Sequence, residues 1–259
     1  MIILESILNF DLSVFEFMNR IIDSAGSWLT PVNEVVTWLG DGAFWIIVGV
    51  LFCIPKKTRK IGIAMLLAQL VMLIANNVIL KSIFSRTRPF ALFNPEVARQ
   101  CINGYDLGGK HYEGWMKPGY LDQVLEEINR FSTDLQQRWL SCFSGHSPLD
   151  LGYPYAHGYS FPSGHTSSSF AAACGMFSMC KGKGQKIAGT VAVILAAFIG
   201  LTRIYLHVHY CTDVLVGSLV GVFCAVAGYF LAKLVYYKLV VKIEDKFNKK
   251  AVPEEEKTV

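Results

Sequence analysis

The chain has 259 residues, of which 53% are hydrophobic and only 17% charged, and its mean hydropathy is +0.38. Soluble domains carry about 25% charged residues, so this composition indicates a membrane protein of one compact domain and excludes an ordinary soluble enzyme. The net charge of +4 is weak evidence by itself, and we expect no nucleic-acid partner.

The first 36 residues are expected to form an interfacial segment on the extracytoplasmic side. The opening stretch MIILESILNFDLSVFEFMNR contains acidic residues and lacks both a basic n-region and a small-residue cleavage site, so we expect no signal peptide. Charges interrupt residues 1–24 repeatedly, which favours an amphipathic helix lying in the membrane interface. A sixth membrane span in residues 1–24 is the alternative.

Five segments are apolar enough to cross a bilayer, which needs about 20 mainly apolar residues. In chain order they are 37–54, 61–80, a segment from the sequence PSGH at 162–165 to about 180, 187–206 and 214–241. We therefore predict an all-α, polytopic helical bundle of about five transmembrane helices over residues 37–241. A basic and then acidic cytoplasmic tail, 242–259, follows it. Gly217 and Gly221 form a small-residue pair of the kind that packs membrane helices.

Lysine-rich clusters between the spans predict the orientation of the chain. The clusters are 56–60, 181–186 and the run from Lys233 to Lys250. Lysine and arginine accumulate in cytoplasmic loops, and five spans place all three clusters on one face. We expect an integral protein of the cell membrane with its amino terminus outside and its carboxyl terminus inside.

Residues from about 90 to 160 differ in composition and are predicted to be an extracytoplasmic, partly helical insertion. Apolar residues at spacings of three, four and seven predict one amphipathic helix in it; they are Leu121, Val124, Leu125, Ile128, Phe131, Leu135 and Trp139. The insertion could cover the face where PSGH emerges, or be a solvated loop. Cys101 and Cys142 could form a disulfide in that compartment, and two free thiols are an equal alternative.

The predicted topology brings three span ends to the same outer face. They carry Lys81, Arg86, Arg88, Ser163, Gly164, His165, Arg203, His209 and Asp213. Such a cluster of cations repels itself unless an anion fills it, and a phosphate offers oxygens that arginine and lysine bind well. The sequence therefore predicts a phosphate site at the membrane surface.

The spacing within this group indicates individual roles. His209 and Asp213 lie four residues apart, so on a helix they share one face, and the aspartate can fix the imidazole tautomer. The other ring nitrogen of His209 is then free to attack. Gly164 lets the backbone approach an anion at a helix amino terminus, and Ser163 adds a hydroxyl donor. His165 is placed to protonate a leaving oxygen.

The three segments carry three spaced patterns, Lys81-x6-Arg88-Pro89, Pro162-Ser163-Gly164-His165 and Arg203-x5-His209-x3-Asp213. Over about residues 37–241 the chain thereby resembles the type 2 phosphatidic acid phosphatase and vanadium haloperoxidase superfamily. Thr202 stands where serine is frequent in that family.

This resemblance implies a membrane-bound lipid phosphatase that uses no metal and forms a phosphohistidine. It implies His209 as nucleophile, Asp213 as its partner and His165 as general acid. The implied phosphate ligands are Lys81, Arg88, Ser163, Gly164 and Arg203.

The leading interpretation is an integral membrane phosphatase that acts on lipid phosphate monoesters or diphosphates, without a cofactor. Phosphatidic acid, phosphatidylglycerophosphate and polyprenyl diphosphate all fit, because each presents a terminal phosphate at the interface. A sugar-phosphate phosphatase of the same superfamily and a non-catalytic lipid-binding or transport protein are the alternatives. The oligomeric state is left open.

Several polar residues near the motifs receive ordinary structural interpretations. We expect Arg86, which lies outside the signature, to contact lipid headgroups. His207 should face another side of a helix than His209. Asn76 and Asn77, inside the second predicted span, are expected to join helices by hydrogen bonds.

Overall fold

The computed structural model describes residues 2–26, 28–236 and 238, and most of them are helical. One bundle of helices lying side by side contains α3 (Gly42–Cys53), α4 (Arg59–Met72), the π-helix η1 (Leu73–Leu80), α5 (Lys81–Phe84), α9 (Gly164–Met179), α10 (Lys183–Tyr205) and α11 (Cys211–Val235). The remaining elements are α1 (Ile2–Ala25), α2 (Leu29–Trp38), α6 (Pro95–Asn103), β1 (Tyr105–Leu107), β2 (Lys110–Tyr112), α7 (Gly119–Arg130) and α8 (Thr133–Phe143). The predicted tail, 242–259, lies outside the described residues.

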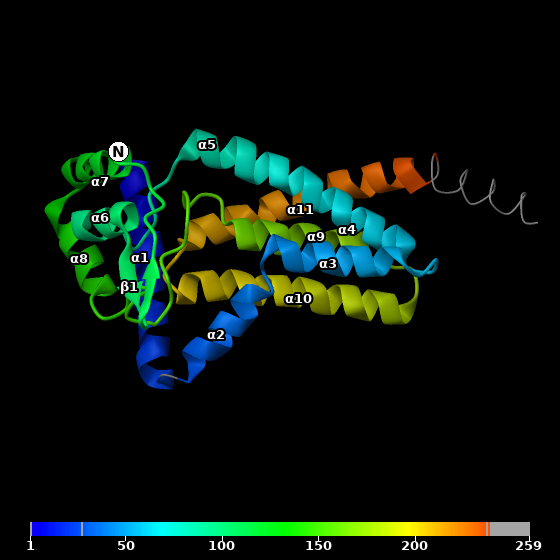
Figure 1. Cartoon of the computed structure of the whole chain (residues 1–259), viewed down its shortest axis with the longest axis horizontal. Helices are drawn as coiled ribbons and strands as arrows, with labels where there is room; N and C mark the ends of the chain where they lie inside the picture. Colours follow the sequence, from blue (N-terminus) through cyan, green and yellow to red (C-terminus); the bar gives the residue numbers. More distant parts are fainter. Residues whose placement is uncertain (1, 27, 237, 239–259) are drawn as a thin grey trace, which may run out of the picture.

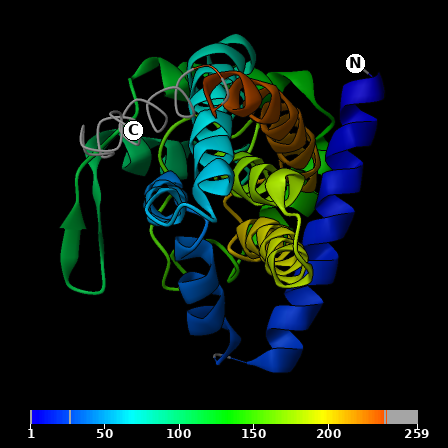
Figure 2. The ribbon, with the colours of Figure 1, turned by 90° about the vertical axis from the view of Figure 1, so that its right-hand side faces the viewer.

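The bundle helices run side by side, and α9 packs against α4, α10 and α11 (Figures 1 and 2). Small residues allow this close packing, as predicted for the pair on α11. A Cβ added to Gly221 would lie 2.6 Å from the carbonyl oxygen of Ser167 on α9. A Cβ added to Gly228 would lie 2.6 Å from the backbone nitrogen of Ala68 on α4. The backbones of three helices therefore touch where glycine leaves room.

All five predicted spans are helical as far as the structure describes them, but they differ in length. Among the described residues, three helices are long and apolar enough to cross a membrane, namely 59–84, α10 and α11, and the bent pair α2 and α3 makes a fourth if it counts as one span. The predicted third span is α9, which has only 16 residues and lies between its neighbours. At 1.5 Å per residue it is shorter than a hydrocarbon core of about 30 Å.

The first predicted span, 37–54, is broken near its start. Helix α2 ends at Trp38 and α3 begins at Gly42, with a bend of 54° between them. Asp41 caps α3 by accepting a hydrogen bond of 2.8 Å from the backbone N–H of Ala43. A Cβ on Gly40 would lie 2.5 Å from Cγ2 of Ile199, so the break is pressed against α10.

The second predicted span runs further than expected, over 59–84, and includes the π-helical turn η1. Asn76 in η1 is fully buried, and its Oδ1 accepts a 3.3 Å hydrogen bond from Ser167 of α9. Asn76 thus joins two helices, as predicted. Its amide nitrogen also donates to Asn77 over 3.0 Å. Single π-turns in α-helices occur frequently at functional sites.

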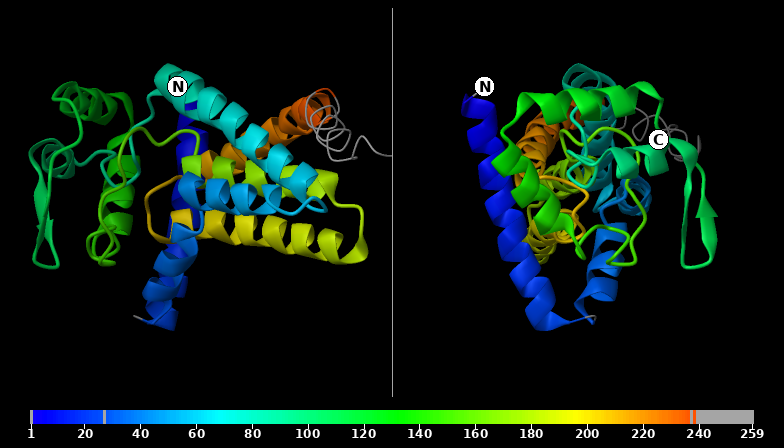
Figure 3. Two further views of the ribbon diagram at one scale, coloured as in Figure 1. Left: turned by 45° about the vertical axis from the view of Figure 1, so that its right-hand side comes forward. Right: turned by 90° about the vertical axis from the view of Figure 1, so that its left-hand side faces the viewer.

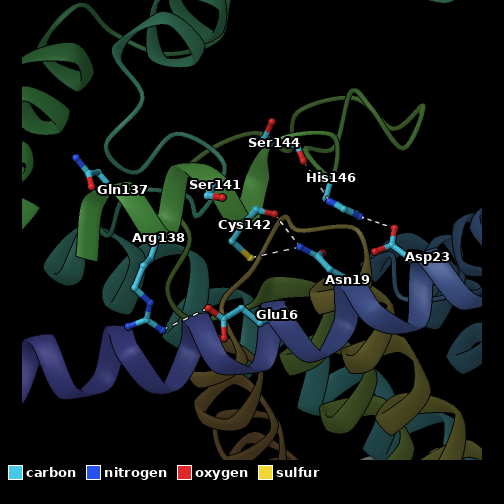
Figure 4. A pocket seen from close by; sticks show the side chains of 9 residues that line it. All are labelled: Glu16, Asn19, Asp23, Gln137, Arg138, Ser141, Cys142, Ser144 and His146. Carbon is cyan, nitrogen blue, oxygen red and sulfur yellow. Dashed lines mark hydrogen bonds and ion pairs between the residues drawn. The ribbon is translucent and has the colours of Figure 1, made fainter. Parts of the chain in front are cut away.

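Helix α1 crosses the end of the bundle instead of joining it (Figures 1 and 3). It is not among the helices that are long and apolar enough to span a membrane. Leu8, Leu12 and Phe15 form its buried stripe. Figure 4 shows how polar contacts hold it to α8. There Asn19 donates 2.7 Å to the carbonyl oxygen of Cys142, and an ion pair of 3.3 Å joins α1 and α8.

The insertion covers the same end of the bundle (Figure 3). The stripe predicted as one helix is two, because Phe131 is extended and Ser132 caps α8 through its hydroxyl, which accepts from Leu135 N–H at 3.4 Å. The proposed bridge between Cys101 and Cys142 is not formed, and both are free, buried thiols. Both side chains belong to the apolar cluster under the insertion, where the thiol of Cys142 accepts a hydrogen bond from Asn19 of α1.

Candidate active site

The three sequence motifs meet where the bundle joins the insertion. Lys81 begins α5, Gly164 begins α9 and Asp213 lies in the first turn of α11. Arg203 belongs to the last turn of α10, and His209 lies in the short connection between α10 and α11. Arg203 and His209 are each only 2% exposed, so the cluster is built into the protein interior and not spread over its surface.

The imidazole of His209 lies between a carboxylate and a guanidinium group. Its Nδ1 lies 3.3 Å from Oδ2 of Asp213, and its Nε2 lies 2.9 Å from Nη1 of Arg88. A guanidinium only donates, so Nε2 must accept and the ring proton must sit on Nδ1, facing the carboxylate. This tautomer presents an unprotonated Nε2 to the cluster of cations.

Asp213 is fixed through both of its oxygens. Oδ2 accepts from the backbone N–H of Tyr210 at 3.2 Å and forms a short hydrogen bond with the hydroxyl of Ser160. Oδ1 accepts from Arg86 at 2.7 Å. The expectation that Arg86 contacts lipid headgroups is therefore wrong. Arg86 points inward because the buried carboxylate of Asp213 attracts its charge and the ring of Tyr210 stacks 3.6 Å below it.

The two buried arginines of the motifs differ in what they bind. The guanidinium of Arg88 donates hydrogen bonds to three main-chain carbonyl oxygens, those of His157 at 2.5 Å, Gly158 at 2.8 Å and Val208 at 2.7 Å. Arg203 donates through Nη1 to Thr37 at 2.6 Å, but its buried Nε has no partner among the residues that the structure describes. A buried donor without an acceptor is costly, which fits a place for a bound anion.

Gly164 and Ser163 start α9 beside Lys81. A Cβ on Gly164 would lie 3.7 Å from Nζ of Lys81 and 3.8 Å from Oδ1 of Asn77, so the missing side chain keeps this corner open. Ser163 is fully buried, and its hydroxyl accepts from Thr166 at 2.9 Å. The amino terminus of α9 thus faces the cations with exposed backbone donors.

A cavity of about 580 Å³ leads from this corner toward the outside of the bundle, between α3 and α4. Lys81, Gly164 and His165 line its inner end. The apolar side chains Ile46, Leu66, Leu70 and Leu73 line its outer part. Leu70 and Leu73 are about half exposed, so the cavity opens on the surface that faces lipid in a membrane.

Burial and positive charge dominate the electrostatics. Desolvation, with Arg88, Arg203 and Lys81 nearby, lowers the pKa of His209 well below its ordinary value. Burial and the charge of Arg203 also lower the pKa of Arg88, to about 10. The site therefore favours neutral His209, and a bound anion would offset its excess of positive charge.

His207 stays outside the cluster. Its ring stacks on Phe15 with centroids 4.9 Å apart, and its Nδ1 lies 2.9 Å from the carbonyl oxygen of Tyr205. Burial lowers its pKa to about 4. It is a core histidine at the contact with α1, in agreement with the prediction that it faces away from His209.

Four residues of the cluster were not singled out as site residues, namely Asp11, Thr37, Arg86 and Ser160. Asp11 carried a usable signal, because it lies three residues after Leu8 and one before Leu12, on the buried face of an amphipathic helix. An acid on such a face needs a partner. Within the described ranges, no three His, Cys, Asp or Glu side chains are grouped as metal ligands.

Part of the chain is similar in sequence to a known phosphatase. Over 92 residues the chain is 34% identical to a lipid A 1-phosphatase of Porphyromonas gingivalis, covering 33% of this chain and 20% of that protein. The chain thus spans about a fifth of the length of this curated relative.

The fold is similar to the crystal structure of a transmembrane PAP2 type phosphatidylglycerolphosphate phosphatase from Bacillus subtilis. That likeness has a TM-score of 0.54 and 21% identity, and covers 90% of this chain and 88% of the other. The family model described as PAP2 superfamily matches residues 57–237, which include all three motifs. The chain is a membrane protein of the PAP2 superfamily.

Proposed function

We propose that the chain is a membrane phosphatase that hydrolyses lipid phosphate monoesters or diphosphates through a phosphohistidine on His209. The observation that carries this proposal is the unprotonated Nε2 of His209, directed into a buried cluster of cations. A second nitrogen, Nε of Arg203, lacks an acceptor in the described part of the chain. A phosphoryl group would supply the missing negative charge and the missing acceptor together.

In the first step, Nε2 of His209 attacks phosphorus while the bond to the leaving oxygen breaks. Lys81, Arg203 and the backbone N–H groups at the start of α9 would hold the equatorial oxygens. Arg88 would turn its Nη1 from Nε2 to a phosphate oxygen, since the lone pair it now binds is needed for attack. His165, at the inner end of the cavity, would give its proton to the leaving oxygen.

In the second step, water attacks the phosphohistidine and His165 takes up its proton. The bond between phosphorus and Nε2 breaks, phosphate leaves and His209 returns to its starting tautomer. Throughout, Asp213 accepts the hydrogen bond from Nδ1–H and stabilises the positive charge that the ring acquires.

The cavity between α3 and α4 supports a lipid rather than a sugar phosphate. Its inner end is basic and its outer wall is aliphatic. A lipid could place its headgroup on Lys81 while its chains remain beside Leu70 and Leu73 in hydrocarbon. A sugar phosphate would leave that apolar wall without a matching surface.

The charge distribution supports an extracytoplasmic site. Lysines from the basic clusters 56–60 and 181–186 and from α11 surround one cavity at the bundle end away from the insertion; they are Lys56, Lys57, Lys60, Lys181 and Lys233. Cytoplasmic ends carry such lysines, so the motifs at the other end would face the opposite compartment. The substrate would then come from the outer leaflet of the cell membrane.

The test is phosphate release by the purified protein in detergent. The panel contains phosphatidic acid, phosphatidylglycerophosphate, a polyprenyl diphosphate and glucose 6-phosphate, each with and without EDTA. We expect release from at least one lipid, little from the sugar, no effect of EDTA and inhibition by orthovanadate. Exclusive hydrolysis of the sugar would support the alternative, and activity lost in EDTA and restored by magnesium would contradict the metal-free mechanism.

A further inference from the structure

A buried carboxylate on α1 is connected to the site by a chain of hydrogen bonds. Asp11 has no exposed surface. Its Oδ1 accepts from the backbone N–H of Thr212 at 2.9 Å, and its Oδ2 accepts from the Thr212 hydroxyl at 2.8 Å. Oδ2 also accepts from Nη2 of Arg86 at 3.0 Å. Every oxygen of this acid is therefore directed at the residues beside Asp213.

Arg86 bridges the two carboxylates. Its Nη2 binds Asp11, and its Nη1 binds both Oδ1 of Asp213 at 2.7 Å and the hydroxyl of Thr212 at 2.8 Å. The planar guanidinium can serve two acids at once, whereas an ammonium group has no such fork. The orientation of Asp213, and through it that of His209, depends on where this guanidinium is held.

We propose that Asp11 and Arg86 are positioning residues of the reaction. They hold Asp213 in the orientation that keeps the proton of His209 on Nδ1, and they set how much negative charge His209 experiences. This inference rests on the proposed function. It assigns a part in the reaction to α1, which precedes the segment 57–237 that matches the family.

The combined charge of Asp11, Arg86 and Asp213 acts on the proton of His209. Asp11 and Asp213 share one cation, so the three groups together carry one net negative charge. Burial raises the pKa of Asp11, and Arg86 and the hydrogen bonds from Thr212 oppose that shift. The other charged or titratable groups around His209 are Lys81 on α5, Arg88, Arg203 on α10 and His165 on α9.

Three variants change this charge in known steps. Asp11→Asn keeps the shape of the side chain but removes its charge. Arg86 then neutralises Asp213 alone, so protonated His209 should lose its proton more easily. Arg86→Gln removes the cation, so Asp213 should hold the proton of His209 more firmly. The double variant Asp11→Asn/Arg86→Gln returns the trio to one net negative charge.

The measurement is kcat and KM for the best lipid phosphate as a function of pH. We expect each single variant to lower kcat about tenfold or more with KM changed less than about threefold, because the phosphate donors are untouched. The acidic limb of the profile should move about one pH unit down in Asp11→Asn and up in Arg86→Gln. In the double variant it should return toward the wild-type position.

Asn19→Ala is the matched control. Asn19 is also a buried polar residue of α1, but its hydrogen bonds hold the helix to Cys142 of α8 (Figure 4). If Asp11 served only to dock α1, both variants would lower kcat alike and leave the pH limbs in place. That outcome, or full activity in Asp11→Asn, would overturn the proposal.

Two further arms separate this inference from the proposed function. Wild-type turnover and its loss in His209→Ala test the function alone. If the wild type releases no phosphate, the affinity for orthovanadate, measured by calorimetry across the same pH range, replaces turnover. The acidic limb of the curve of vanadate affinity against pH must still move in opposite directions in the two single variants. If it does not move, the positioning roles are wrong. If Asp11→Asn fails to fold, Arg86→Gln and the double variant still decide the comparison.

Discussion

Two side chains of opposite charge determine the protonation of His209. Arg88 donates to Nε2 and Asp213 accepts from Nδ1, so the ring has one tautomer before any substrate arrives. His209→Ala should therefore abolish phosphate release, by about a thousandfold or more. Because His209 is buried, the thermal unfolding of this variant must be measured beside its activity.

Asp213→Asn is the more informative partner variant. An amide can donate a hydrogen bond to Nδ1, which would place the ring proton on Nε2 and block attack. We expect a large loss of kcat with little change in KM. Near-normal turnover in either Asp213→Asn or His209→Ala would remove the phosphohistidine mechanism.

The acidic side of the pH profile reports on His209. The neutral ring attacks, and burial with nearby cations lowers its pKa, so the neutral form persists as the pH falls. The acidic limb of kcat/KM should lie below about 6.5, the ordinary histidine value. The basic limb should reflect loss of the proton from the general acid, giving a bell.

This profile should be recorded with two substrates, because a phosphate monoester itself titrates near pH 6. A limb that belongs to the enzyme stays in place when the leaving group changes. An acidic limb at or above pH 7 for both substrates would contradict the assignment.

The motif spacing predicted that His209 and Asp213 meet, because a residue just before a helix and one in its first turn lie close together, although His209 itself lies in the connection before α11. His209 and Asp213 are four residues apart, and the structure joins them as expected. Spacing could not reveal Ser160, whose contact with Asp213 depends on the path of the loop before α9. Nor could it show that Arg88 would bind three carbonyls, since backbone carbonyls leave no mark in a sequence.

Among the elements, the cavity between α3 and α4 has a direct test. Leu70→Trp puts a large ring into its apolar part. We expect KM for a long-chain lipid phosphate to rise about tenfold. Hydrolysis of p-nitrophenyl phosphate should change little, because that ester has no chain to accommodate.

Leu219→Trp is the control, since Leu219 lies on α11 and is similarly exposed but away from this cavity. An equal rise of KM in both variants would indicate a general effect on the membrane helices. Unchanged lipid kinetics in Leu70→Trp would place the route elsewhere.

Apolar runs predicted which segments are helices but not where they break. Residues 39–41 lie inside a predicted span, yet the contact of Gly40 with Ile199 and the cap at Asp41 divide the segment there. The stripe of the insertion likewise crosses Ser132 without interruption. Helix caps and tertiary contacts determine where both helices break, and the periodicity of apolar residues predicts neither caps nor tertiary contacts.

At the scale of the whole molecule, sidedness has the widest consequences. The variant Lys110→Cys places a probe in the exposed hairpin of the insertion, and the variant Lys183→Cys places one at the basic end of α10. A membrane-impermeant maleimide applied to intact cells should label the first and spare the second. The wild type gives the background, since its cysteines are all buried or partly buried.

The reverse pattern would invert the topology. The chemistry would remain, and the substrate pool would move to the cytoplasmic leaflet. Labelling of both positions after detergent treatment shows that each cysteine is reactive.

The position of α1 also bears on how the protein is made. This helix is translated before the membrane helices, but Thr212, which donates two hydrogen bonds to its buried acid, is translated about two hundred residues later. Until then Arg86 supplies the one remaining donor, to Oδ2, and docking would bury Oδ1 of Asp11 without a partner. Nascent chains stopped before residue 212 should therefore expose α1 to protease, and chains that include α11 should protect it. The phosphate site would be completed only when the start of α11 is made, after the membrane helices that precede it.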